Sequence, residues 1–442
     1  MKSSCVALAV GAVLSWIAQG SVHAATPQSW SQFQGDAAHS GYVSGTINPA
    51  QFQLIWSLSA ASLGYTSFVP NVAIDSGQVY VSGLNQNGSN PYTGLVTFNA
   101  ATGSTAWSQT LPIAWFGSLS APSVGNGLVY VDRFGDTNVI GQIPPTIYAF
   151  HTGNGAQAFA TNYDGQSDVG GQPAISGGNL YLSGGTYGGF NTYNAISGAL
   201  TASNYLPFQE GWTAAADSTH AYVYLPAAGN PNIGALYVFG PSGTTTIQNP
   251  PNNYTSLNQV SNVTLGAQND ALIVTSTNGG PWQLTSFDLQ GQSVKWRANL
   301  SYTYPFGNFL AYDSGKIAIN NGVIYVDNGN KLSLFSETDG SHITDWISPD
   351  GQLVVGNPIV TDNVLFAQTS DATYALDLVT LNTLWSVPST GELALSNGEL
   401  LIDNGSTISA YSAPEPASGS LLLLTAACLL RRRRRRGIYG RE

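Results

Sequence analysis

Cysteine is almost absent from this 442-residue chain, which contains only Cys5 and Cys428. Both lie in apolar segments close to the termini, so the long body between them has no disulfide and no thiol chemistry. A thiol-ligated haem site is excluded from the body for the same reason. The body must therefore be held together by its hydrophobic core alone, which a large domain can achieve.

Charged residues are also scarce, at 8% of the chain, and most of the basic ones lie at its two ends. Lys2 and seven C-terminal arginines account for eight of the 13 basic side chains. The body keeps five basic residues against 22 acidic ones, which gives it a net charge of about −17. Such a surface repels a phosphate backbone, so the composition argues against nucleic-acid binding. The five basic residues of the body are Arg133, Lys295, Arg297, Lys316 and Lys331.

Motifs of common catalytic sites are missing from the sequence. It contains neither a Gly-x-Ser-x-Gly elbow nor a phosphate-binding loop. No two of its histidines stand at the spacing of zinc ligands. Apolar residues show no sustained helical spacing, and the abundance of Gly, Thr, Val and Tyr is typical of a turn-rich all-β protein. The five histidines are His23, His39, His151, His220 and His342.

One short frame recurs along the chain. In its first clear copy a β-forming run ends at Phe98, and the polar residue Asn99 follows; Gly103 and Trp107 come four and eight positions after Asn99. A β-rich run also precedes each copy, and eight such runs stand mostly about 40 to 50 residues apart, a period that indicates a β-propeller. The other copies of the frame start at His151, Asn194, Asp288, Ser336 and Asp377.

This period predicts an all-β, eight-bladed β-propeller, with seven blades as the alternative if segments 170–204 and 211–249 are divided wrongly. One small sheet cannot bury both of its faces, so it must stack against the next copy. The aromatic residue eight positions after each start would fill the gap between adjacent blades, and the glycine four positions after it would supply a left-handed turn residue. The expected aromatic anchors are Trp56, Trp107, Phe159, Trp296 and Trp385.

The two ends of the repeat region complement each other. The strand around Trp56 has no upstream partner, whereas residues 391–411 look like a blade that lacks its Trp-bearing strand. We therefore expect residues 50–58 to complete the last blade, which closes the ring and removes open sheet edges. The other blades are expected at 66–110, 118–161, 170–204, 211–249, 260–299, 313–348 and 355–388.

The opening of the body, from Trp30 to Tyr42, resembles that of proteins with pyrroloquinoline-quinone-like (PQQ-like) propeller repeats, and the resemblance extends over about residues 30–411. It implies the architecture more firmly than an activity. Quinoprotein dehydrogenases of this class hold their quinone with calcium, acidic and amide ligands, a stacking tryptophan and a vicinal disulfide. Because the body has no cysteine, that pattern is incomplete. We expect no cofactor, and PQQ or calcium remains the alternative.

The N-terminus has the pattern of a secretory signal peptide over residues 1–24. A basic start at Lys2 precedes an apolar run from Cys5 to Ala18, and a small-x-small site ends at Ala24. Cys5 lies ahead of the apolar run instead of after it, which argues against a lipoprotein. The mature body would then comprise residues 25–412.

The C-terminal segment 413–442 combines a Pro-Glu-Pro motif, an apolar run over 420–430 and six arginines. It resembles a PEP-CTERM sorting signal. That resemblance implies recognition by an exosortase, transient tethering in the inner membrane, and release to the cell surface or extracellular matrix. An ordinary tail anchor is the alternative, although a membrane span needs about 20 apolar residues. The residues that carry the signal are Pro414, Glu415, Pro416, Arg431, Arg432 and Arg433.

Three other features of the body are candidates for binding. His39 could act as a ligand or base, although capping of a turn beside Asp36 is the simpler interpretation. The stretches 132–136 and 164–168 each place two aspartates on short loops, where calcium or plain solvation are the alternatives. Aromatic residues outside the repeat frame could form a glycan or protein contact face or pack between blades. They are Trp115, Phe116, Tyr187, Trp212, Trp282, Tyr302, Tyr304 and Phe306.

The sequence thus favours an exported, non-catalytic propeller that acts as a binding or scaffold module for a glycan or a surface protein, in extracellular polymer or biofilm organisation. The alternative is a quinone- or metal-dependent periplasmic or extracellular oxidoreductase that uses the central channel. A third interpretation is an assembly scaffold like the propeller lipoprotein of outer-membrane assembly, against which the missing lipobox and the C-terminal tail argue.

Overall fold

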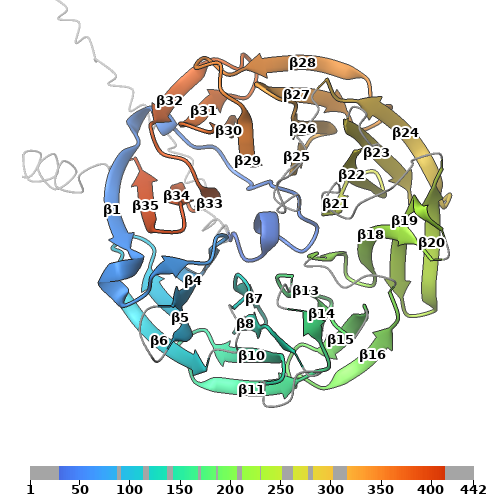
Figure 1. Cartoon of the computed structure of the whole chain (residues 1–442). Helices are drawn as coiled ribbons and strands as arrows, with labels where there is room; N and C mark the ends of the chain where they lie inside the picture. Colours follow the sequence, from blue (N-terminus) through green and yellow to red (C-terminus); the bar gives the residue numbers. More distant parts are fainter. Residues whose placement is uncertain are drawn as a thin grey trace, which may run out of the picture.

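The computed structural model describes residues 29–86, 91–112, 119–136, 143–167, 171–185, 188–206, 212–228, 230–250, 262–276, 282–301 and 316–413. These residues form eight antiparallel sheets that stand as blades around a ring (Figure 1). The eight-bladed propeller expected from the repeat is confirmed, and the seven-bladed alternative is wrong. Within the described ranges, no helix is both long and apolar enough to cross a membrane.

Each blade runs from an inner strand near the ring axis to an outer strand at the rim. Blade one contains β2 (Ser67–Phe68), β3 (Ala73–Asp75), β4 (Gln78–Asn85), β5 (Tyr92–Asn99) and β6 (Thr105–Pro112). Blade two contains β7 (Ser123–Gly125), β8 (Leu128–Arg133), β10 (Thr146–His151) and β11 (Gln157–Asn162). Blade three contains β13 (Ala174–Ser176), β14 (Asn179–Ser183), β15 (Phe190–Asn194) and β16 (Leu200–Asn204). Blade four contains β17 (Ala215–Ala216), β18 (Ala221–Ala227), β19 (Asn230–Gly240) and β20 (Gly243–Asn249).

The second half of the ring repeats this order. Blade five contains β21 (Thr264–Leu265), β22 (Asp270–Ser276), β23 (Trp282–Asp288) and β24 (Ser293–Asn299). Blade six contains β25 (Ile317–Asn320), β26 (Val323–Asp327), β27 (Lys331–Ser336) and β28 (His342–Ile347). Blade seven contains β29 (Val354–Val360), β30 (Val364–Thr369), β31 (Thr373–Asp377) and β32 (Thr383–Val387). Blade eight contains β33 (Glu392–Ser396), β34 (Glu399–Asp403), β35 (Thr407–Ser412) and β1 (Gln53–Ser59). The short 3-10 helices η2 (Pro49–Gln51) and η3 (Ala60–Leu63) flank β1, and η1 (Phe33–Gly35) lies further upstream. β9 (Gly135–Asp136) pairs with β12 (Gln166–Ser167).

The hydrophobic core lies between neighbouring blades. Every residue of the middle strand β8 is buried, whereas the rim strand β11 alternates between exposed and half-buried residues. This difference follows from the stacking, because a middle strand is covered on both faces by the adjacent blades. Between blades one and two, for example, Tyr80 and Leu95 share one apolar cluster with Val129 and Phe150.

The ring closes through the N-terminal strand, as the sequence predicted. β1 pairs antiparallel with β35, so that Trp56 stands opposite Ala410 and Ser59 opposite Thr407. Figure 1 shows β1 as the rim strand of the blade that β33, β34 and β35 form. Blade eight therefore draws its strands from both ends of the body, and the ring has no unpaired joint.

The residues ahead of β1 fill the centre of the ring. Residues 30–43, here called the axial segment, lie on the axis among the inner strands (Figure 1). Inner strands of seven blades each donate one backbone N–H to this segment, at distances of 2.6 to 2.9 Å. The donors are Ile74, Val124, Ile175, Ala216, Leu265, Ile319 and Val360.

Two glutamine side chains of the axial segment take part in the same contacts. The Gln32 amide bonds both backbone groups of Ile175, accepting from its N–H at 2.7 Å and donating to its carbonyl at 3.0 Å. The Gln34 amide donates to the carbonyl of Ile317 at 3.1 Å. Gln32 thus pairs with the inner strand of blade three as a strand backbone would, and the axis is closed at this level.

Candidate functional site

The sorting residues Pro414, Glu415, Pro416, Arg431, Arg432 and Arg433 lie outside the described residues, as does the signal peptide. The interpretation of both termini therefore stays a prediction.

His39 lies inside the propeller, in the axial segment. Its side chain is buried, and Nδ1 lies 2.7 Å from the carbonyl oxygen of Val263, to which it donates. Burial lowers the pKa of His39 to about 4, so the ring is neutral near pH 7. The turn expected beside Asp36 is present, but it forms between the His39 backbone N–H and the Asp36 carbonyl, and the Asp36 carboxylate accepts from Ser40 instead. His39 is thus a packed core residue of the axis.

The prediction that aspartates at 132 and 136 lie on a loop was wrong. Asp132 is a buried residue of β8, and residue 136 belongs to β9, which pairs with β12 at residues 166–167. Tyr163 donates its hydroxyl to Asp132 at 2.7 Å, and burial raises the pKa of Asp132 to about 7. In the described part of the chain, no three His, Cys, Asp or Glu side chains gather closely enough to hold a metal ion.

Two of the aromatic residues outside the repeat frame pack in the interior. Trp212 is 3% exposed and stacks on Phe190 at a ring distance of 5.9 Å, and Trp282 is 5% exposed in the apolar cluster between blades five and six. The remaining ones, Trp115, Phe116, Tyr187, Tyr302, Tyr304 and Phe306, lie outside the described residues.

The aromatic anchors lie at the seams, the interfaces between adjacent blades. The Trp107 ring of blade one lies against Gly155 in the hairpin of blade two, where a Cβ would be only 2.6 Å from the ring. Its indole N–H donates to the carbonyl of Thr152 at 2.9 Å. Gly155 has φ +69°, so the turn also needs a residue that tolerates left-handed backbone. This pair thus joins a ring, a glycine and a carbonyl across one seam.

The same arrangement recurs at other seams. Trp56 lies against Gly103, and Phe159 lies against Gly198. Trp296 lies against Gly340 and donates to the carbonyl of Glu337 at 2.9 Å. Trp385 differs, because the hairpin of blade eight is split between the chain ends, and its ring contacts Phe52 and Tyr411.

Removal of one aromatic anchor should lower the stability of the propeller. We expect Trp107→Ala to lower the free energy of unfolding by about 3 kcal/mol, because it empties a half-buried site and removes a hydrogen bond across the seam. Urea denaturation followed by fluorescence measures the change. Trp107→Phe keeps most of the ring and should cost clearly less; equal costs for both variants would contradict a role in filling the seam.

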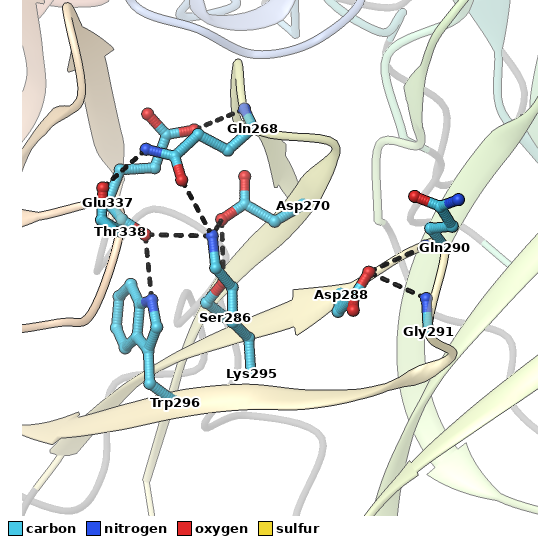
Figure 2. Close-up of polar contacts among 10 residues, drawn as sticks. All are labelled: Gln268, Asp270, Ser286, Asp288, Gln290, Gly291, Lys295, Trp296, Glu337 and Thr338. Atoms are coloured by element: carbon cyan, nitrogen blue, oxygen red, sulfur yellow. Dashed lines mark hydrogen bonds and ion pairs between the residues drawn. The ribbon is translucent and has the colours of Figure 1, made fainter.

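A polar cluster lies beside Trp296 at the seam between blades five and six (Figure 2). The Lys295 ammonium group donates to the carboxylate of Asp270 and to the side-chain carbonyl of Gln268, both at 3.2 Å. The Glu337 carboxylate accepts from the backbone N–H of Gln268 at 2.9 Å. Figure 2 shows Lys295 reaching up from β24 between these groups, so the lysine joins the two blades.

The chemistry of this cluster is that of a structural junction. Burial raises the pKa of Glu337, and the neighbouring Asp270 carboxylate raises it further. Lys295 offsets part of this unfavourable burial, since its charge lies within hydrogen-bonding distance of Asp270. Three acceptors surround the ammonium group, including the carbonyl of Glu337 at 3.4 Å. The Lys295 ammonium group is therefore bound by acceptors of the protein itself.

The seam between blades four and five contains a cavity of about 360 Å³. At the position of Trp107, blade four carries Thr245, which pairs with Val238 as Trp107 pairs with Thr97. At the position of the hairpin glycine, blade five carries Gln292 with φ +50°. Both Thr245 and Gln292 line the cavity, so the space lies where another seam holds an indole ring.

Polar groups surround the mouth of this cavity. The Asp217 carboxylate accepts the Tyr222 hydroxyl at 2.6 Å and the backbone N–H of His220 at 2.7 Å. The His220 side chain is 41% exposed, and Asn269 borders the cavity from blade five. Since its volume lies in the range of small-molecule sites, this cavity is a candidate binding site. The sequence carried one signal for it, the missing aromatic at the anchor position of blade four.

Comparisons with known proteins agree with this architecture. A family model described as "Outer membrane protein assembly factor BamB" matches residues 39–298. Among solved structures, a europium-containing methanol dehydrogenase aligns with a TM-score of 0.67 at 10% identity, covering 87% of this chain and 98% of the other. BamB from Moraxella catarrhalis aligns with a TM-score of 0.55 at 11% identity, covering 82% and 98%. A search of curated proteins gave no match.

These two structural likenesses are too distant in sequence to show more than a shared fold. The family model, in contrast, matches more than half of the chain and does so through the repeats that build blades one to five. The chain therefore belongs to the BamB-type family of PQQ-like β-propellers.

Proposed function

We propose that this chain is an exported, non-catalytic propeller that binds a glycan or a surface protein at the cell surface or in the extracellular matrix. The observation that carries the proposal is the filled ring axis. Seven inner strands bond to the axial segment, so the chain itself occupies the place where a central ligand would lie. Binding is then directed to the blade seams and the outer faces, where the cavity between blades four and five lies.

The alternative is an oxidoreductase that holds a quinone or a metal in the central channel. At the level of the inner strands, a quinone would have to displace buried residues such as Trp30, Gln32 and Phe33. The buried axial histidine already donates to the backbone of blade five. The residues around the axis thus do not fit an axial quinone at this level, and we derive no redox step through one.

The proposed location depends on the two termini. A signal peptide over residues 1–24 and a PEP-CTERM-like tail over 413–442 together support export, processing by an exosortase and release from the inner membrane. The negative body supports a partner other than nucleic acid.

A second candidate function is an assembly scaffold, which the family match favours, since the matching model is described as an outer membrane protein assembly factor. The C-terminal tail and the position of Cys5 ahead of the apolar run support the first proposal instead. An assembly factor would be needed for normal levels of outer-membrane proteins, and a gene deletion followed by membrane proteomics distinguishes the two.

The binding proposal is tested on the processed protein purified from its own host. We expect saturable binding on an array of extracellular glycans and surface proteins, and mass spectrometry should show chain ends near residues 25 and 414. In parallel, the protein is incubated with PQQ and calcium and tested for dye-linked alcohol oxidation. Uptake of one quinone per chain with turnover would overturn the proposal in favour of the dehydrogenase.

A further inference from the structure

The repeat itself shows what shape the cavity between blades four and five can hold. In blade one, Tyr80, Thr97 and Trp107 stand side by side on β4, β5 and β6. In blade four, the corresponding row on β18, β19 and β20 is Tyr222, Val238 and Thr245. The tyrosine is thus kept, whereas Val238 replaces the middle threonine and Thr245 replaces the ring at the seam.

One wall of the cavity is a tyrosine that faces an aromatic ring in other blades. The rings of Tyr80 and Trp107 lie 6.2 Å apart at 58°, and those of Tyr130 and Phe159 lie 6.3 Å apart at 50°. Tyr222 occupies the same place and lines the cavity. Aromatic pairs prefer this tilted geometry. The His220 ring already lies 6.2 Å from that of Tyr222 at 46°, so a bound ring would join this pair at the seam.

The repeat frame places a backbone carbonyl at a fixed position across each seam. The indole N–H groups of Trp107 and Trp296 donate to the backbone carbonyls of Thr152 and Glu337, each one residue after the start of the repeat frame in the next blade. The corresponding residue of blade five is Leu289, which lines the cavity. A bound ring with an N–H group at its inner edge would match this arrangement.

The size and rim agree with a ligand of this kind. A cavity of about 150 Å³ already accepts benzene, and this one measures about 360 Å³. Asp217 and His220 at the mouth are held by hydrogen bonds to Tyr222 and Thr219, so they present fixed polar groups to a substituent on the ring.

We propose that the cavity between blades four and five binds a planar aromatic ring that carries an N–H group, in the position that tryptophan takes at other seams. The ring is that of a free indole-type molecule or of a tryptophan side chain in a partner peptide. The inference rests on the proposed function and deepens its protein-binding part if the ring belongs to a partner peptide, whereas a free indole-type molecule would be a ligand beyond that function.

Isothermal titration calorimetry with indole and the processed protein tests the proposal. We expect one saturable site, and 1-methylindole, which lacks the N–H, should bind about three- to tenfold more weakly. A short tryptophan-containing peptide forms the second arm: tighter binding of the peptide assigns the ring to a protein partner, and tighter binding of indole assigns it to a free molecule. Absence of saturable binding of all three probes overturns the inference.

A matched double variant fills the cavity with a side chain of the protein itself. Thr245→Trp together with Gln292→Gly rebuilds the ring and glycine pair, so it should abolish indole binding and raise Tm by a few degrees. Thr246→Trp, at an exposed position of the same strand, should leave binding unchanged. Unchanged indole binding in the double variant would also overturn the inference.

A measurement on the unmodified protein covers the case in which the double variant does not fold. Indole should slow hydrogen exchange of backbone amides in 240–245 and 289–293, and protection elsewhere instead of there would contradict the assignment. This inference and the proposed function can fail independently. Binding of glycans on the array without binding of indole would support the proposed function and contradict only the assignment of this site.

Discussion

Replacement of Gln32 by methionine should lower the free energy of unfolding by about 4 kcal/mol. The two side chains have similar length, so the loss comes from hydrogen bonding and not from volume. Gln32 is buried and satisfies both the N–H and the carbonyl of Ile175. Methionine would leave two buried backbone groups without a partner, at a cost of roughly 1 to 3 kcal/mol each.

Chemical denaturation of the Gln32→Met variant measures this effect, and Gln51→Met provides the control. Gln51 is exposed at the end of η2, so its substitution should change the unfolding free energy by less than about 0.5 kcal/mol. If the two variants were equally stable, the axial segment would not be contributing to the fold as its hydrogen bonds indicate.

Stability should fall as the pH rises from about 4 to about 7. Burial raises the pKa of both Asp132 and Asp403 to about 7, from the ordinary value of 3.8. A raised carboxyl pKa means that the folded chain holds the proton more tightly, so the stabilisation is complete below the ordinary pKa and is lost toward the raised one. Between pH 5 and pH 8, each group should cost about 3 kcal/mol.

Asn substitutions separate the two contributions. Asp132→Asn keeps an acceptor for the Tyr163 hydroxyl, and Asp403→Asn keeps one for the backbone N–H of Gly405. Each should reduce the loss of unfolding free energy between pH 5 and pH 8 by roughly half, measured by urea denaturation at both values. The exposed control Asp371→Asn should leave the pH dependence as it is. A parent protein equally stable at both pH values would contradict the prediction.

At lower pH another carboxylate, that of Asp345, limits the stability. Hydrogen bonds from Lys331, Ser333 and His342 hold the pKa of Asp345 at about 2, against its partial burial. Because that pKa is lowered, its contribution is present above the ordinary value of 3.8 and is lost as the pH falls toward 2. The pH of greatest stability should therefore lie near 4 to 5.

The ring closure was predictable because its signals are local. Residues around Trp56 have the pattern of an outer, Trp-bearing strand without the other strands of a blade. The β-rich run ending at Tyr411 has the pattern of those other strands without the outer one. The axial segment gave no such signal, since most of its contacts are backbone hydrogen bonds to strands that lie as far away in sequence as blade seven, and they follow no periodic pattern. Asp132 was misplaced because its polar side chain suggested a loop, whereas the strand continues through it.

The candidate site was harder to predict than the fold. The missing aromatic in blade four was visible, but it did not show whether neighbouring side chains collapse into the gap. At the seam between blades three and four, the anchor position is Ala202, which faces a tight two-residue hairpin of blade four. At the next seam, Thr245 faces a longer hairpin that carries Leu289 and Gln292, and the gap persists as a cavity.

The participation of both chain ends in one architecture has a consequence for the timing of folding. The first residues of the body to leave the ribosome need partners on every inner strand up to blade seven, and β1 needs β35, which is made last. Contacts over such long sequence separations form slowly. The axial segment and β1 therefore cannot complete their pairing until the whole body has been synthesised, and only then can the molecule take its final shape.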